Sequence, residues 1–226
     1  MAGSYGIHPD YHKSSSRDKP IQEVPAPDLL YIPLSQHIGA PAQAKVKAGD
    51  EVKAYQEIGE AKSFISAGVH SPVDAHVKEI LEYDTPVGVK SETIVLENKG
   101  PGEKPVEKDY SKIKPSGIVD KVKQAGIVGM GGAMFPTHVK LSPPDDKKID
   151  KLIINAAECE PYLSADHRVM LEYTQEVAEG VKLLSKALGG VEVVFAIEDN
   201  KPDAIEVISN HLPDAVKIIE TKYPMG

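Results

Sequence analysis

A glycine-rich stretch followed by a proline and a lysine is the part of this sequence best suited to chemistry. Glycines stand at positions 126, 129, 131 and 132, and Phe135, Pro136 and Lys140 follow them. Glycine tolerates positive φ and lets a ligand approach the backbone closely, while proline suits the first turn of a helix. A turn of this kind leading into a helix points unpaired N–H groups at one spot, which favours a phosphate. We therefore predict a phosphate-cofactor loop, with a tightly packed structural turn as the alternative.

A second group of polar residues follows a buried strand predicted at residues 152–154. Asn155, Glu158 and Glu160 come directly after it. Ligands of parallel sheets bind outside the carboxyl ends of the strands, and alternate residues of an extended segment point the same way, so we expect Glu158 and Glu160 to share a face. An amide and two carboxylates suit a flavin or the amide and ribose of a nicotinamide. The alternative is a carboxylate pair that closes a turn before Pro161.

The single cysteine, Cys159, lies between these glutamates. One cysteine excludes internal disulfides, and it also excludes an iron–sulfur cluster held by this chain alone, which normally takes four thiolates. Its acidic neighbours disfavour a low-pKa catalytic thiol, so we expect a small packed residue.

The composition indicates a soluble globular protein with one large domain or two modest ones. The chain has 226 residues, of which 41% are hydrophobic and 27% charged. A net charge of −8 argues against nucleic acid or an anionic membrane surface as a direct partner. No apolar run approaches the roughly 20 residues of a membrane helix, and no signal peptide is visible, so we expect no direct membrane insertion. His8 and His12 are four apart, but Pro9 disfavours a shared helical face, so we expect no metal site.

Four segments follow from the order of the patterns. Residues 1–28 are proline-rich and predict an extended N-terminal segment; residues 29–98 contain short β-type runs broken by turns and predict a β-rich domain. Residues 99–115 form a glycine- and proline-rich linker. Residues 116–226 predict an α/β domain in which helices and strands alternate around a parallel sheet with right-handed crossovers.

Local signals set the expected elements of the α/β domain. We expect a helix at 117–125 with Ser116 as its N-cap and Gly126 as its stop signal. One long helix should run from Asp166 to about 188, because apolar residues recur every three or four positions. Strands at 191–197 and 216–219 should flank a further helix capped by Asn200.

The β-rich domain resembles the biotinyl/lipoyl-like barrel-sandwich family. The resemblance lies in the spacing of three short motifs: Gly49-Asp50-Glu51-Val52, Ile58-Gly59 and Ser71-Pro72-Val73. In that family a lysine on an exposed hairpin carries a swinging cofactor. Lys62 lies near that place, but Ala61 and Ser63 replace the usual neighbours. We therefore expect the fold without the attachment, and Lys62 as a solvated surface lysine.

Two longer motifs, at residues 129–140 and 155–161, resemble the flavin- and NADH-binding subunit of respiratory complex I. They are still more similar to the RnfC family, which forms part of the Rnf ion-translocating ferredoxin:NAD oxidoreductase. Residues 6–9, 33–41 and 158–168 are also similar to that family. The resemblance implies a Rossmann-like FMN-binding domain after the barrel-sandwich domain.

The resemblance also implies roles for particular residues. FMN would be held without a covalent bond by the loop residues Gly129, Gly131, Gly132, Ala133 and Phe135. Lys140, Asn155, Glu158 and Tyr223 would complete the cofactor-binding set. Glu160 would lie near the isoalloxazine and the nicotinamide as the catalytic candidate. Hydride would pass between NAD(H) and the flavin, and single electrons between the flavin and iron–sulfur clusters.

The family pattern extends beyond Gly226. After Tyr223-Pro-Met-Gly226 the family has a Gly-Glu of the nicotinamide pocket and then a cysteine-rich cluster domain, so we expect an electron-transfer fragment truncated at its C-terminus and lacking the iron–sulfur part. Its partners would be other subunits of a membrane-bound complex on the cytoplasmic face, with ferredoxin as an indirect partner. The alternatives are a soluble flavoprotein reductase of cobalamin or amino-acid reductase systems, and a non-catalytic docking scaffold.

Overall fold

The computed structural model describes residues 6–85, 88–106, 110, 112–144 and 146–224, which fall into two compact units. One unit consists of residues 24–145, and the other joins residues 1–23 to residues 146–226. The boundaries expected at residues 28, 98 and 115 rest on composition and, as domain limits, stay predictions.

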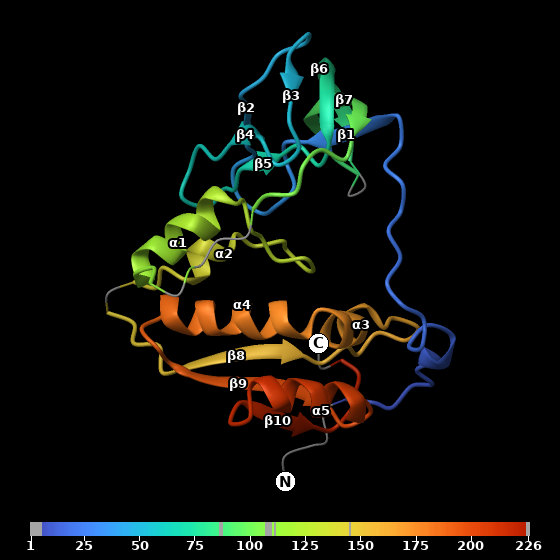
Figure 1. Cartoon of the computed structure of the whole chain (residues 1–226), viewed down its shortest axis with the longest axis vertical. Helices are drawn as coiled ribbons and strands as arrows, with labels where there is room; N and C mark the ends of the chain where they lie inside the picture. Colours follow the sequence, from blue (N-terminus) through green and yellow to red (C-terminus); the bar gives the residue numbers. More distant parts are fainter. Residues whose placement is uncertain (1–5, 86–87, 107–109, 111, 145, 225–226) are drawn as a thin grey trace. The chain divides into compact units, whose positions relative to one another are not determined.

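The unit of residues 24–145 contains two antiparallel sheets, as the barrel-sandwich prediction requires (Figure 1). The first has the order β1-β7-β6-β3, built from β1 (Leu29–Pro33), β7 (Lys90–Gly100), β6 (Asp74–Asp84) and β3 (Glu51–Val52). The second has the order β2-β4-β5, built from β2 (Gln43–Ala44), β4 (Glu57–Glu60) and β5 (Val69–His70). Fully buried Ile58 of one sheet and Val77 and Leu96 of the other share a single hydrophobic core, which confirms the sandwich.

The loop at the expected cofactor hairpin carries an ordinary surface lysine. Lys62 is exposed and forms an ion pair with Glu60.

Helix α1 (Pro115–Gln124) ends in a glycine motif that turns the chain sharply. Gly126, at φ +65°, donates its N–H to the Lys123 carbonyl at 3.0 Å, and Ile127 donates to the Val122 carbonyl at 3.2 Å. This pair of bonds is the Schellman motif, and it confirms Gly126 as the stop signal. The expected N-cap at Ser116 was wrong: the N-cap residue is Lys114 and the helix begins at Pro115, two residues earlier than expected, because proline fits the first helical position. The chain then reaches the short helix α2 (Thr137–Lys140).

The other unit is built on a parallel sheet of three strands in the order β10-β9-β8. The strands are β8 (Lys151–Ala156), β9 (Glu192–Glu198) and β10 (Val216–Ile219). Helices α3 (Ala165–Glu172) and α4 (Thr174–Ala187) connect the first two, and α5 (Pro202–His211) connects the last two. Alternate strand residues such as Phe195 and Ile197 share one core with residues of all three helices, so the helices cover one face of the sheet. The predicted parallel α/β fold is confirmed.

Two expectations for the helices of this unit were wrong in detail. The single helix expected from Asp166 is broken at Tyr173, where φ is −125° and ψ is 36°. The Thr174 hydroxyl donates to the Met170 carbonyl at 2.6 Å and occupies the acceptor that a continuing helix would use. Helix α5 is preceded by Lys201 rather than Asn200 as its N-cap residue.

The N-terminal segment, residues 7–21, packs on the parallel-sheet unit. Ile7 pairs antiparallel with Tyr223, and a short 3₁₀ turn (Lys13–Ser15) follows. In Figure 1 this blue segment lies beyond the arrowhead of β8, at the carboxyl end of the strand. Residues far apart in sequence therefore meet at the sheet edge where ligands of such folds bind.

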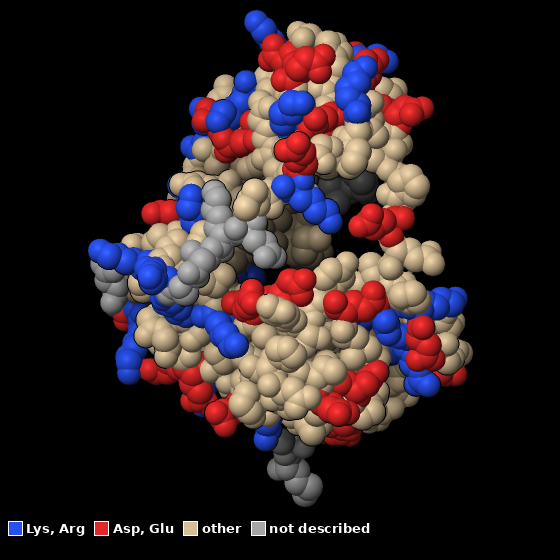
Figure 2. Space-filling view, viewed as in Figure 1, with Lys and Arg blue, Asp and Glu red and all other residues tan. Residues whose placement is uncertain are grey.

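The charged side chains are mixed in sign. Figure 2 shows acidic and basic residues interspersed on the drawn face of each unit, in keeping with the modest net charge of −8. Among the described helices, none has the length and apolar character needed to cross a membrane.

Candidate cofactor-binding site

The glycine loop, residues 126–136, is a tight outward turn of the unit of residues 24–145. The Gly129 N–H donates to the Phe135 carbonyl at 3.0 Å, and the Met134 N–H donates to the Gly131 carbonyl at 3.2 Å. Gly132 and Met134 both have positive φ, +58° and +48°. Met130 at the tip is 98% exposed. The loop is thus shaped by its own backbone.

Several amides of this loop remain open to a ligand. Within the described part of the chain, the N–H groups of Gly131, Gly132 and Ala133 make no hydrogen bond. A Cβ atom at Gly131 or Gly132 would meet nothing within 4 Å, so no protein group fills the space beside them. Free amides without side-chain bulk are the feature that a phosphate site needs.

Contacts with loops of the barrel-sandwich sheets fix the position of the glycine loop. The Ile38 N–H donates to the Ala133 carbonyl at 3.1 Å, and the ring Nε2 of buried His138 lies 3.0 Å from the Phe64 carbonyl. Gly126 lies against the backbone of Gly68, whose carbonyl oxygen would be only 2.3 Å from an added Cβ. The backbone that carries the exposed amides is therefore held in place by the rest of the unit.

Lys140 ends helix α2 with an exposed side chain. It makes no hydrogen bond or ion pair with any other described residue. Its charge is thus available to a ligand.

The residues at and after the carboxyl end of β8 differ in how far their side chains are available. Asn155 is exposed, and its Oδ1 accepts the Ala157 N–H at 3.0 Å. Glu160 is exposed as well. Glu158 is only 4% exposed, and its Oε1 accepts the Asp166 N–H at 2.7 Å in the first turn of α3. The expectation that Glu158 and Glu160 share a face therefore does not match the structure.

Lys13 of the N-terminal segment binds the loop that carries these glutamates. Its Nζ lies 2.7 Å from the Glu158 carbonyl, 3.1 Å from the Glu160 carbonyl and 2.6 Å from the Leu163 carbonyl. It also lies 3.4 Å from Glu158 Oε2. Tyr223, four positions after β10, is joined to Ile7 by backbone hydrogen bonds of 2.8 and 2.9 Å.

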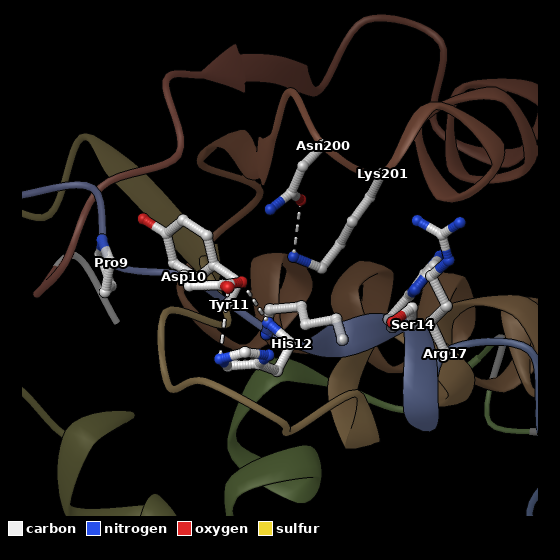
Figure 3. A pocket seen from close by; sticks show the side chains of 10 residues that line it. Pro9, Asp10, Tyr11, His12, Ser14, Arg17, Asn200 and Lys201 are labelled. Carbon is white, nitrogen blue, oxygen red and sulfur yellow. Dashed lines mark hydrogen bonds and ion pairs between the residues drawn. The ribbon is translucent and has the colours of Figure 1, made fainter.

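A hollow of about 570 Å³ lies between the N-terminal segment and the start of α5 (Figure 3). Asp10 and His12 line one side and Asn200 and Lys201 the other. The lysines and the arginine at this hollow each have a carboxylate partner: Lys13 with Glu158, Arg17 with Asp18, and Lys201 with Glu198. The balanced charges do not favour an anionic ligand in this hollow.

Two buried polar atoms beside the hollow lack partners. Within the described residues, the Tyr11 hydroxyl and Oε1 of Glu198 are buried and accept or donate no hydrogen bond. Burial raises the pKa of the Tyr11 hydroxyl, and the negative charge of Glu198 raises it further. The phenol therefore stays protonated at neutral pH.

Comparisons with known proteins find a matching family model for each half of the chain and relatives that match almost all of it. Residues 3–101 match the family model described as the RnfC barrel sandwich hybrid domain, and residues 122–226 match the Nuo51 FMN-binding domain. The C subunit of the proton-translocating ferredoxin:NAD(+) oxidoreductase complex of Clostridium ljungdahlii is 42% identical over 98% of this chain and 50% of its own length. The chain belongs to the RnfC family.

Other relatives agree with this assignment. The C subunit of the Na(+)-translocating ferredoxin:NAD(+) oxidoreductase complex of Acetobacterium woodii is 42% identical over 98% of this RnfC-family chain and 52% of its own length. The C subunit of the ion-translocating oxidoreductase complex of Rhodobacter capsulatus is 38% identical over 98% of the chain and 44% of its own length. The chain spans about half the length of the first two relatives.

The loop of this RnfC-family chain fits the cofactor of its matched domain. FMN carries a phosphate, and the open amides of Gly131, Gly132 and Ala133 lie within the stretch that matches the FMN-binding domain. The unpartnered charge of Lys140 lies in the same stretch. Asn155, Glu158, Glu160 and Tyr223 belong to the other compact unit, and their contacts to a cofactor stay predictions.

Sequence reasoning did not find the role of Lys13 in this RnfC-family chain. Lys13 lies in a segment without periodicity, and its partners are more than a hundred residues away, as with Glu160 at a separation of 147. Only the similarity of residues 6–9 to the family pointed to this segment at all.

Proposed function

We propose that this RnfC-family chain binds FMN at the glycine loop and NAD(H) beside it, as part of an electron-transfer subunit. The observation that supports this most directly is the set of open amides at Gly131, Gly132 and Ala133, inside the stretch matched by the FMN-binding domain. Bare amides with no obstructing side chain hold a phosphate without any cost of rearrangement.

Each proposed ligand residue has a defined task. The Lys140 ammonium adds charge-assisted hydrogen bonding to the phosphate. The Asn155 amide and the exposed Glu160 carboxylate offer hydrogen bonds to a ring edge or to hydroxyl groups. Both carboxylate oxygens of Glu158 are engaged within the protein, and so are its N–H and its carbonyl. We therefore propose that Glu158 contributes to the site by holding the loop after β8 in place. We propose that Tyr223, held by Ile7, contributes from the edge of β10.

FMN, when bound, supplies the ability to exchange hydride with a nicotinamide and single electrons with iron–sulfur clusters, which we place outside this chain. The names of the relatives support a place in an ion-translocating ferredoxin:NAD oxidoreductase complex. We propose that partner subunits hold the protein on the cytoplasmic face of the membrane. Ferredoxin would be reached only through those partners.

A titration with FMN tests this function. Bound flavin is detected by the quenching of its fluorescence, and the Gly131→Val variant is compared with the parent. A Cβ at position 131 would meet no protein atom within 4 Å, so the fold should survive while the approach of the phosphate is blocked. We expect FMN affinity to fall by about a hundredfold or more, equal to about 2.7 kcal/mol.

The matched control is Gly180→Val, because Gly180 lies in α4 with equal space for a Cβ. Its FMN affinity should equal that of the parent, and thermal unfolding should show both variants folded. A parent chain that binds no FMN leaves the docking-scaffold alternative, and a Gly131→Val variant that binds normally removes the loop from the site.

A further inference from the structure

The loop of residues 158–163, between β8 and α3, has little structure of its own. Its residues belong to no helix or strand. Tyr162 has a positive φ of 67°, which is uncommon for a residue with a side chain and costs about 1–3 kcal/mol unless neighbours impose it. The surroundings must therefore determine the conformation of this loop.

The N-terminal segment supplies most of those surroundings. The Tyr162 N–H donates to the Tyr11 carbonyl at 2.8 Å, and the Ser16 hydroxyl donates to the Tyr162 carbonyl at 2.7 Å. The rings of His12 and Tyr162 stack with centroids 4.9 Å apart. The strained residue is thus held on three sides by residues 11–16.

Lys13 makes the central contact. Its ammonium, with a side chain only 10% exposed, reaches the carbonyls of Glu158, Glu160 and Leu163 and the carboxylate of Glu158. An ammonium has three N–H donors, so it is saturated by these acceptors. Removing it would leave three carbonyls and the buried Glu158 carboxylate short of a donor, and the loss is most costly at Glu158, where the contacts are partly buried.

The side chain of Glu160 projects from the loop that Lys13 holds. Glu160 is exposed, while its own carbonyl is bound by Lys13 at 3.1 Å. The direction of the Glu160 carboxylate is therefore coupled to the position of Lys13. We propose that Lys13 is a positioning residue, which fixes the 158–163 loop and with it the direction of the Glu160 side chain.

Cys159 offers a direct measurement of this loop. It is the only cysteine in the sequence, lies between two of the three residues whose carbonyls Lys13 binds, and is 2% exposed. A thiol reagent reacts with it only when the loop opens, so the labelling rate under native conditions reports local opening. We expect Lys13→Met to raise the rate by about tenfold or more, with little dependence on denaturant.

Three comparisons make the labelling result decisive. Lys13→Arg keeps the charge but cannot place one nitrogen among four acceptors, so it should give an intermediate rate. Lys19→Met removes an exposed lysine of the same segment and should leave the rate unchanged. Equal rates for Lys13→Met and the parent, or an equal rise with Lys19→Met, would overturn the proposal. Should Lys13→Met not fold, hydrogen exchange of residues 158–166 in Lys13→Arg decides the same question.

The link from Glu160 to a cofactor rests on the proposed FMN function and needs a second measurement. In a parent chain that binds FMN, Lys13→Met and Glu160→Gln should each weaken binding, and the double variant should be no weaker than the weaker single variant. Additive losses would show that Lys13 does not act through Glu160. Absence of FMN binding in the parent would contradict the proposed function, while the labelling result would still decide the role of Lys13.

Discussion

Lys140 and Glu158 show what separates a ligand-binding side chain from a structural one. Lys140 is exposed and makes no hydrogen bond or ion pair with another described residue, whereas Glu158 is buried and binds both Lys13 and the start of α3. Removing a charge that has no partner among the described residues costs the unliganded protein no stabilising interaction. Substitution of Lys140 should therefore affect binding and leave stability almost unchanged.

The first prediction concerns Lys140→Ala. We expect FMN binding to weaken by about 1–3 kcal/mol, because a charge-assisted hydrogen bond to phosphate is lost. Isothermal titration or fluorescence quenching measures this change. Lys47→Ala, which removes an exposed lysine elsewhere in the same unit, is the control and should bind as the parent does. An unchanged affinity in Lys140→Ala would remove this lysine from the site.

The sequence identified the candidate residues but could not rank them. Asn155, Glu158 and Glu160 follow the strand predicted at residues 152–154 and look equally suited to a ligand. The partner that occupies Glu158, Lys13, lies 145 residues earlier in the chain, and no local pattern records such a contact. Residue type and spacing indicated the chemistry, and only tertiary contacts showed which side chains are available for it.

The glycine loop is an element whose shape depends on the helix before it. Helix α1 closes with the Schellman bonds of Gly126, and the same glycine lies against the Gly68 backbone. This position has two independent requirements: a backbone with positive φ, and no Cβ atom. The stop signal was readable from the sequence, since glycine after an apolar periodic stretch ends a helix, but the contact with Gly68 was not.

A comparison of Gly126→Ala with Gly49→Ala separates these two requirements. The Gly126→Ala variant should lose about 1–3 kcal/mol or more in free energy of unfolding, because a Cβ at φ +65° is strained and would lie 2.3 Å from the Gly68 carbonyl oxygen. Gly49→Ala is the matched control, with φ +93° and nothing within 4 Å, so it carries only the backbone strain. Chemical denaturation measures both. Equal losses would show that the close approach to Gly68 contributes nothing.

The break between α3 and α4 is a feature that hydrophobic periodicity does not predict. Apolar residues recur through Met170, Tyr173 and Val177 at helical spacing, so the pattern predicts one helix. The hydroxyl of Thr174 competes for the Met170 carbonyl and ends the first helix. Such a side-chain bond leaves the hydrophobic pattern intact, which explains why the sequence did not show the break.

At the scale of the whole molecule, ionised carboxylates tie distant parts of the chain to the parallel-sheet unit. The hydrogen bond from Arg168 lowers the pKa of Glu172, and the N–H of Ile21 lowers it further, although desolvation opposes both. The Thr221 hydroxyl and N–H lower the pKa of Asp199. Both carboxylates therefore contribute to stability in the ionised form.

These shifts give a definite acid dependence. A carboxyl whose folded pKa lies below its unfolded value stabilises the protein fully above the unfolded pKa, about 4, and loses this contribution as the pH falls through the folded pKa. We expect Tm to decline below about pH 4. The pH dependence of Tm should be shallower in Glu172→Gln and Asp199→Asn. A variant whose acid decline matches that of the parent would show that its carboxylate does not take part.

The backbone pairing of Ile7 with Tyr223 has a consequence for synthesis of the chain. Ile7 acquires this partner only after some two hundred more residues have been translated, about the separation of the pair. Lys13 likewise has no acceptors until residues 158–163 have been translated, and the nascent segment stays solvated in the meantime. Closing so long a loop is slow, so this edge should be the last part of the fold to form. A bulky tag fused close to residue 7 would interfere at that late step.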